Sequence, residues 1–413
     1  MKQITLLLTI ALLFLNTLTA FAKDTYPDFS IKGFGTLGLS GTDTDQLGFR
    51  RDITQYPGVT NNWGFDNDSR LGLQLDAEIN KSWHVAVQWV ARNHAGDFGE
   101  QNLDWAFLRW RPRDDLDIRA GRLGFDVFML SEYRNVGYAY LWIRPPHEFY
   151  SGLPVYHFDG MDIAKKFTVA EGILTIKAYG GYSFIQVPNG SSAVDQGFTV
   201  VGGKLAYEVG NWNARLGYIY AQNNFESAPL QPVLDALNGA AINVVWPGAQ
   251  ALIPQIATKD KHVHFSSISL SYDNGHWLTQ MEASYIDTTL STYPNIASGY
   301  LSVGRRFGKV TLYSLLGISK TLNKQIRLFN PLVPVPEVME LRTAADQLLN
   351  PNGVNEKSVS LGLRWDINEH IALKTQWSHY WLGSNGTSLW LAPVSGATPD
   401  TVNVWSLGMD FVF

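Results

Sequence analysis

The sequence contains no cysteine among its 413 residues. Disulfide bonds therefore cannot stabilise the fold, and no cysteine is present to carry a lipid anchor. Long apolar runs are also lacking beyond the first residues, because no stretch approaches roughly 18 uninterrupted apolar positions, and this excludes helical membrane spans. A strong positive charge is absent as well: the formal net charge is -5. Nucleic acid is therefore not expected as a partner.

The first 22 residues have the three parts of an export signal. Lys2 supplies a positive start, Ile4–Leu15 is apolar, and Ala20-Phe21-Ala22 matches the small-residue cleavage pattern. The apolar run has about a dozen residues, whereas a helix that crosses a bilayer needs roughly 20. We expect residues 1–22 to be a cleaved signal peptide and residues 23–413 to form one exported domain. The alternative is an uncleaved anchor.

Glycine and aromatic residues are abundant, with 37 Gly, 14 Trp, 18 Tyr and 21 Phe. Trp and Tyr form interfacial girdles on outer-membrane barrels, and glycine lets tilted strands curve. An exported chain without disulfide bonds needs another stabilising network, and a closed hydrogen-bonded barrel supplies one. The composition therefore favours an all-β antiparallel transmembrane barrel in the bacterial outer membrane.

Alternating apolar and polar segments of about ten residues recur along the chain, as in membrane barrels. We expect 16 strands, at 28–40, 69–80, 82–93, 103–112, 116–125, 158–168, 172–182, 198–208, 211–222, 262–272, 276–287, 299–307, 309–319, 357–367, 370–381 and 402–413. Short turns such as Asp273-Asn274-Gly275 alternate with long loops, as periplasmic turns alternate with extracellular loops. The expected long loops are 41–68, 94–102, 126–157, 183–197, 223–261, 288–298, 320–356 and 382–401.

The two faces of the expected strands differ in chemistry. In 357–367, for example, Leu361 and Leu363 alternate with Ser360 and Arg364. Charged groups on one face cannot fill a dry interior, because they would be buried without partners. We therefore expect an apolar outer surface and a water-filled lumen.

The last segment, Val402–Phe413, shows the same alternation and ends on an aromatic residue. It resembles the closing strand of Gram-negative outer-membrane barrels, whose last residue helps the barrel-assembly machinery to recognise them. The resemblance implies that Trp405, Phe411 and Phe413 form the barrel-closing terminus. It also implies contact with outer-membrane lipid and lipopolysaccharide.

The connector 126–157 is too apolar for a loop in water, yet it lacks strand alternation. Such a segment needs an inner surface to cover, and in a barrel that surface is the lumen wall. We therefore expect an inward-folded third extracellular loop that forms a constriction. Its candidate residues are Asp126, Glu132, Arg134, Tyr138, Tyr140, Trp142, Arg144, His147 and Glu148.

A 16-strand chain whose third long loop follows Arg119-Ala120-Gly121-Arg122 resembles the trimeric porins. The stretch Trp142-Ile143-Arg144-Pro145-Pro146-His147-Glu148 is similar to a W-x-R-P-P-x-E segment of a porin-like group in proteobacteria whose substrates are largely unassigned. The resemblance implies a homotrimer in which acidic loop residues face a basic wall. By strand phase, the basic lumen wall would comprise Lys32, Arg70, Arg92, Arg109, Arg111, Lys177, Arg215, Arg364 and Lys374. Each of these cations could instead simply pair with a neighbouring acid.

These features predict a porin that passes small hydrophilic solutes and ions passively and needs no cofactor. The alternative is a substrate-specific channel for a small carboxylate, aromatic or sugar-like solute. A barrel enzyme or adhesin is a third possibility, but the sequence has no G-x-S-x-G motif or phosphate-binding glycine loop, and we expect no catalytic residues. His262 and His264 share a phase with Ile268, which places them on the outer face, so no metal site is expected. The apolar loops 223–261 and 320–356 are expected to cap the mouth, although they could descend into it or cover a neighbouring subunit.

Overall fold

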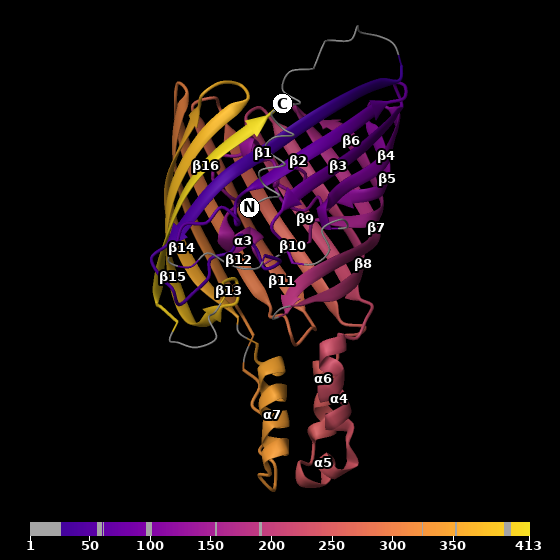
Figure 1. Cartoon of the computed structure of the whole chain (residues 1–413). Coiled ribbons are helices and arrows are strands. Elements are labelled where there is room, and N and C mark those ends of the chain that lie inside the picture. Colours follow the sequence, from indigo (N-terminus) through magenta and orange to yellow (C-terminus); the bar gives the residue numbers. More distant parts are fainter. Residues whose placement is uncertain are drawn as a thin grey trace.

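The computed structural model of the chain describes residues 26–55, 60, 62–95, 101–152, 155–189, 192–323, 325–351, 353–391 and 398–413. Within these residues, 16 strands form a closed barrel in which each strand pairs antiparallel with its neighbours along the chain (Figure 1). β1 closes the ring by pairing with β16, with Gly35 opposite Phe411. The predicted fold class and strand number are confirmed. The predicted signal peptide, residues 1–22, lies outside the described residues.

The strand bounds are β1 Asp28–Thr42, β2 Arg70–Glu78, β3 Trp83–Arg92, β4 Leu103–Arg113, β5 Leu116–Gly124, β6 His157–Val169, β7 Gly172–Asn189, β8 Ser192–Val209, β9 Trp212–Asn223, β10 His262–Asp273, β11 Trp277–Thr288, β12 Ile296–Phe307, β13 Val310–Thr321, β14 Val354–Asp366, β15 Ile371–Thr387 and β16 Thr401–Val412.

Three strands, β7, β8 and β15, are much longer than predicted. β7 and β8 pair from Ile173 and Glu208 out to Asn189 and Ser192, so most of the expected loop 183–197 is a strand hairpin. β15 likewise takes up the start of the expected loop 382–401. The prediction was wrong here because it used the length of strand that a bilayer requires. Barrel strands extend further wherever backbone pairing continues.

The outer surface of the barrel is apolar, as predicted. Leu75, Leu216 and Leu361 are exposed by 47%, 51% and 53%, whereas the alternate residues Asp76 and Ser360 are buried. This contrast between the faces is what a wall between hydrocarbon and an inner polar space requires. No helix in the described part of the chain is long and apolar enough to cross a membrane.

The seam between β1 and β16 depends on glycine. The rings of Phe413 and Phe411 lie directly over Gly33 and Gly35, where a Cβ atom would come within 2.1 and 2.4 Å of the ring atoms. The backbone of Phe413 also exchanges two hydrogen bonds with Gly33, at 2.8 and 2.9 Å. The last residue of the chain is therefore held by the first strand.

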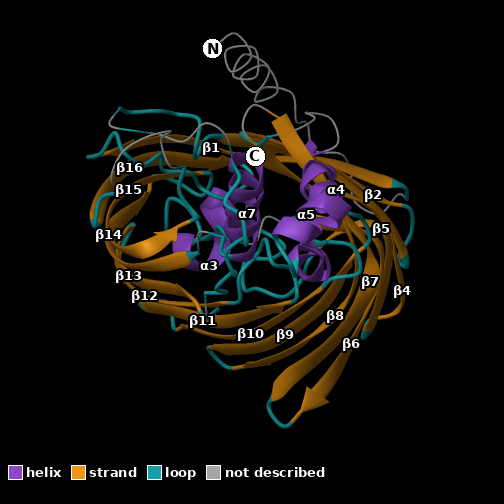
Figure 2. Cartoon of the chain, turned by 90° about the horizontal axis from the view of Figure 1, so that it is seen from below, coloured by secondary structure: helices purple, strands orange, loops and turns teal. Residues whose placement is uncertain are grey.

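Two long loops carry helices that project beyond the barrel, at the end opposite the C-terminus (Figure 1). The β9–β10 loop forms η2 Ala228–Leu230, α4 Gln231–Asn238, α5 Ala240–Val245, η3 Ala249–Leu252 and α6 Ile253–Ile256, and the β13–β14 loop forms α7 Pro336–Leu349. Leu237, Ile256 and Val338 are among the buried residues that join these helices in one small apolar cluster. Seen along the barrel, α4, α5 and α7 overlie the ring of strands (Figure 2).

Candidate functional site in the barrel interior

The connector between β5 and β6 contacts the inner side of distant strands. Within it, η1 Gly137–Ala139 and α3 His147–Tyr150 are short helices, and Figure 2 shows α3 inside the ring. Trp142 Nε1 donates to Ser302 Oγ at 2.8 Å, and the Met129 amide donates to Glu282 at 2.9 Å. In a third contact the strand residue is the donor: the Ser267 hydroxyl of β10 donates to the Val127 carbonyl of the connector at 2.7 Å. Trp142 is only 2% exposed, because the interior packs around it.

Arg144 anchors this connector to the opposite wall. Its Nε and Nη2 donate to the two oxygens of Asp68, at 2.8 and 2.5 Å. Nη2 also donates to Ser40 of β1 and Ser406 of β16, at 2.7 and 2.6 Å. Burial alone would raise the pKa of Asp68, but the Arg144 guanidinium holds that pKa below its usual value. The pair is therefore an internal tie between connector and wall.

Three of the predicted wall cations donate hydrogen bonds to backbone carbonyls of residues 135–142. They are Lys374, Arg364 and Arg70. Lys374 Nζ donates to the carbonyls of Gly137, Tyr140 and Trp142 at 2.6–2.8 Å. Arg364 donates to the Tyr138 and Tyr140 carbonyls, and Arg70 donates to the Asn135 carbonyl at 2.6 Å. These side chains hold the connector in place, and their charge is directed at its carbonyl oxygens.

His147 and Glu148 reach β13 and β14. His147 Nδ1 lies 2.9 Å from Glu356 Oε1, and Trp390 Nε1 donates to the other oxygen of Glu356 at 2.8 Å. The Glu148 carboxyl packs over Gly317, where a Cβ would lie 2.3 Å away. Burial and the neighbouring Glu356 charge raise the pKa of Glu148 to about 7.

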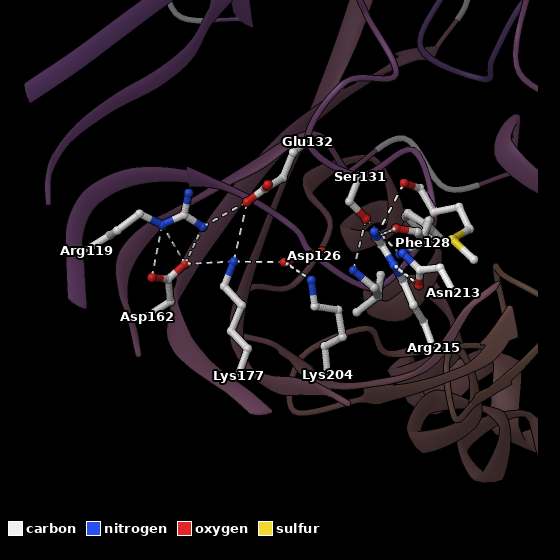
Figure 3. Close-up of polar contacts among 12 residues, drawn as sticks. Arg119, Asp126, Phe128, Ser131, Glu132, Asp162, Lys177, Lys204, Asn213 and Arg215 are labelled. Atoms are coloured by element: carbon white, nitrogen blue, oxygen red, sulfur yellow. Dashed lines mark hydrogen bonds and ion pairs between the residues drawn. The ribbon is translucent and has the colours of Figure 1, made fainter. Parts of the chain in front are cut away.

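A cluster of opposite charges spans the connector and the β5–β8 wall (Figure 3). Lys177 Nζ lies 2.9 Å from Asp126 and 3.4 Å from Glu132, and Lys204 also binds Asp126, at 2.5 Å. Arg119 bridges Asp162 and Glu132 at 2.6 and 3.1 Å. Burial would raise the pKa of Asp126, but the two lysines hold it well below its usual range. Here acidic loop residues do face a basic wall, and we call these six side chains the charge cluster.

Arg215, beside the charge cluster, donates to the Phe128 and Met129 carbonyls at 3.4 Å (Figure 3).

The other predicted wall cations pair with acids of the wall itself. Lys32 lies 3.2 Å from Asp76, and Arg92 lies 2.8 Å from Asp104. Arg109 and Arg111 share Asp117 at 2.6 and 3.0 Å. All of these acids lie on barrel strands, so the structure does not bring these four cations together with the charge cluster.

The remaining predicted connector residues contact other groups of the protein. The Arg134 guanidinium lies 3.4 Å from the centre of the Tyr156 ring and donates to the Val155 carbonyl. The Tyr140 hydroxyl accepts a hydrogen bond from Arg70 at 2.6 Å, and its side chain is 5% exposed. Tyr138 stacks under Arg364, 4.8 Å from the ring centre. Most of these aromatic rings are in contact with protein groups.

Sequence reasoning missed Arg119, Lys204, Glu282 and Glu356 as site residues. Glu282 and Arg119 lie on the inward phase of predicted strands, so their alternation could have identified them. Lys204 follows Gly202-Gly203, where the absence of side chains hides the phase. Glu356 lies at the end of the expected loop 320–356, where no periodicity exists to place it, although the structure includes it in β14.

The inner surface is not polar throughout, which corrects the expectation of a uniformly wet lumen. At the end of the barrel that carries the loop helices α4–α7, which we call the helical end, neighbouring strands present apolar residues inward. These residues line a cavity of about 380 Å³. Its strand residues include Ile185, Val200, Ile219, Ala221, Val263, Phe265 and Ile296.

His262 and His264 lie together on β10, with ring centres 5.2 Å apart. His264 Nδ1 is 2.6 Å from the hydroxyl of Tyr218, which is 45% exposed on the outer surface. Among the described residues, no group of three or more potential metal ligands comes together.

No protein-family model matches the sequence, and no curated protein matches it. Solved structures do. OmpF of Salmonella typhi, in a complex with daunomycin, has a TM-score of 0.54 and 12% identity over 94% of this chain and 98% of its own. An anion-selective porin from Comamonas acidovorans has a TM-score of 0.52 and 13% identity, covering 94% and 100%. The outer-membrane channel DcaP of Acinetobacter baumannii has a TM-score of 0.52 and 11% identity, covering 96% and 100%.

At these identities the likeness concerns the fold and not the substrate. The structural match covers nearly the whole of this chain and of each matched chain. The chain therefore has the fold of the outer-membrane porins.

Proposed function

We propose that the protein is an outer-membrane channel for the passive passage of small polar solutes and ions, narrowed by the connector between β5 and β6. The observation that carries this proposal is the charge cluster, in which acids of that connector face cations of the barrel wall inside a closed ring. A closed ring satisfies its backbone hydrogen bonds between neighbouring strands and leaves no open sheet edge. It can therefore span a membrane and enclose a passage.

The charges of the cluster balance, and this makes its field sensitive to single changes. Arg119, Lys177 and Lys204 oppose Asp126, Glu132 and Asp162. Opposite charges across a narrow gap produce a transverse field, which orders water and orients a dipolar solute. Glu132 is the most exposed member, with 44% of its side chain accessible, so it is the group best placed to meet a passing ion.

The test is the reversal potential of the purified protein in planar bilayers under a KCl gradient. Lys204→Gln removes one cation from the balanced cluster and is expected to shift selectivity toward cations. Glu132→Gln removes one anion and is expected to shift it toward anions. The matched control is Arg306→Met, which breaks an exposed ion pair with Asp273.

Opposite shifts from the two variants, with no shift in the control, would support the proposal. A protein without ionic conductance would refute the channel. A conducting protein whose reversal potential is unchanged in both variants would refute the role of the charge cluster.

A second candidate is a substrate-selective channel, and the apolar cavity near the helical end favours it. A general pore for hydrophilic solutes has no need of an apolar inner surface. The homotrimer, the contact with lipopolysaccharide and the recognition of Phe413 by the assembly machinery stay predictions from the resemblance.

A further inference from the structure

The inner surface near the helical end carries two continuous rows of apolar side chains. Across β8, β9 and β10, Val200 pairs with Ala221 and Ala221 with Val263. In the second row, Ile219 pairs with Phe265, Phe265 with Ile286, and Ile286 with Ile296. Inward positions of a barrel that holds only water are normally polar. A concave apolar surface of this kind is typical of a ligand site.

Residues of several loops also line the cavity. Phe125 and Phe128 of the β5–β6 connector line it, and the Phe128 ring packs 5.2 Å from the ring of Phe265. Ile53, Tyr293 and Leu389 line it from three other loops. The enclosed volume is about 380 Å³, which lies in the range of small-molecule pockets, roughly 300–1,000 Å³.

Arg50 also lines this cavity, and it is a buried cation that makes no ion pair with an acid in the described part of the chain. It is 8% exposed, and it donates to the carbonyls of Leu389, Ile53 and Ser388 at 2.9, 3.3 and 2.7 Å. Within the described residues it forms no ion pair closer than 4.0 Å. Burial lowers the pKa of Arg50 to about 10, with Asp52 acting in the opposite direction, so the guanidinium stays charged at neutral pH.

The acids around the cavity are otherwise engaged. Glu226 accepts hydrogen bonds from the amide and hydroxyl of Thr258 and from the Lys259 amide. Asp195 is exposed and accepts one from Gln186. Asp52, near Arg50, accepts from Thr54 and from the Tyr156 hydroxyl. Arg50 therefore supplies a positive charge next to an apolar space, with donor hydrogens left over, since guanidinium has five.

We propose that this cavity binds a monocarboxylate with an apolar body, with the body against the strand rows and the carboxylate on Arg50. A planar guanidinium suits a carboxylate, because two parallel hydrogen bonds can form between them. The role of this cavity as the entry site of a channel rests on the proposed function. Phe125 and Phe128, which line the cavity, lie on the same connector segment as Asp126, to which Lys204 donates, and Arg215 donates to the Phe128 carbonyl.

The experiment measures binding without requiring conduction. The full-length protein is placed in lipid nanodiscs, and saturation-transfer NMR compares 2-naphthoate with its neutral analogue 2-naphthalenemethanol and with acetate; empty nanodiscs correct for partitioning into lipid. We expect 2-naphthoate to bind on the order of tenfold more tightly than the alcohol, since a hydrogen bond to a charged group has about that effect. Acetate is expected to bind too weakly to detect, because it lacks the apolar body.

Two variants act from different elements. Arg50→Met is expected to remove the preference for naphthoate over the alcohol, and Arg50→Lys to retain part of it. Because Arg50 also ties two loops together, Ala221→Trp provides a second variant that fills the cavity from β9 and leaves Arg50 in place. It is expected to weaken both probes on the order of tenfold. Arg306→Met, at the far turn, is the control and is expected to change neither.

Equal affinity for acid and alcohol would overturn the assignment of a carboxylate site, and so would binding that Ala221→Trp leaves unchanged. A protein that conducts ions but binds neither probe refutes this inference alone. One that binds naphthoate through Arg50 but carries no current refutes the channel and keeps the binding site.

Discussion

Removing the Arg144 guanidinium tests whether the connector is held by buried charge. The Arg144–Asp68 pair has 2% and 0% of its side chains exposed, and the two contacts measure 2.8 and 2.5 Å. In Arg144→Met, the Asp68 carboxylate stays buried and loses its cation. An uncompensated buried charge of this kind destabilises a protein by about 3–5 kcal/mol.

The chain offers a matched pair for comparison. Arg306 and Asp273 make the same two-contact geometry, at 2.6 and 2.9 Å, with 32% and 51% of their side chains exposed. Water can replace the lost partner there, so Arg306→Met is expected to lower the free energy of unfolding by about 1 kcal/mol or less. Both variants remove a guanidinium from a two-contact ion pair; the Arg144 pair is buried, and Arg144 also donates to Ser40 and Ser406.

The assay is urea unfolding in lipid vesicles, combined with single-channel recording. Arg144→Met is expected to lose several times more stability than Arg306→Met, and its current is expected to be noisier because the connector is released from β1 and β16. The double variant Arg144→Met/Asp68→Asn removes both charges and is expected to recover most of the loss. If the two single variants lose the same stability, the inference that buried charge anchors the connector is wrong.

Two further predictions concern the buried Glu148 carboxyl and the seam between β1 and β16. Glu148 has its pKa raised from 4.5 to about 7 by burial and by Glu356, so the folded chain holds more protons than the unfolded chain between these values. The stabilising contribution of Glu148 is therefore expected to be largest below about pH 4.5 and to be lost, by about 3 kcal/mol, as pH rises through 7; the difference in urea midpoint between the wild-type protein and Glu148→Gln across this range checks it. At the seam, Gly33→Ala would push a methyl group into the Phe413 ring, which lies 2.1 Å from the Cβ position. We expect slower barrel closure in a gel-shift folding assay, whereas Gly210→Ala, at a turn with open space around it, should fold at the normal rate and lose only backbone stability.

The strands were predictable because adjacent residues of a membrane-barrel strand face different environments, lipid outside and the lumen inside, and therefore differ in polarity. In β14, Leu361 faces outward and Ser360 inward, and each step of the chain repeats that choice. The inward placement of the connector was predicted from its apolar content and stays a prediction; in the structure, Trp142 and Ile143 of this connector are buried. Strand ends were less predictable, since backbone pairing in β7 and β8 continues after the contrast between solvents has ended.

The partners of the charged groups could not be predicted in the same way. Arg144 and Asp68 are separated by 76 residues and lie in two different loops, so only the folded path of the β5–β6 connector brings them together. The apolar cavity did leave a signal, because Ile219 and Val263 lie on the phase opposite the outward Tyr218 and His264. Near the helical end both phases are therefore apolar or aromatic. A search for a single apolar face passes over such a segment.

In the proposed channel, burial decides more than the sign of the charge which ionisable group would act on a passing solute. Arg144 and Lys374, with side chains no more than 2% exposed, direct their charge at Asp68, Asp410 and loop carbonyls, and a solute in the lumen cannot reach them. Glu132, at 44%, can be reached, and its partners Arg119 and Lys177 stand beside it. The buried cations thus fix the connector, so that the accessible Glu132 carboxylate keeps a constant position beside Arg119 and Lys177. A substitution in the first group should change how steadily the passage is held, and one in the second should change which ions it prefers.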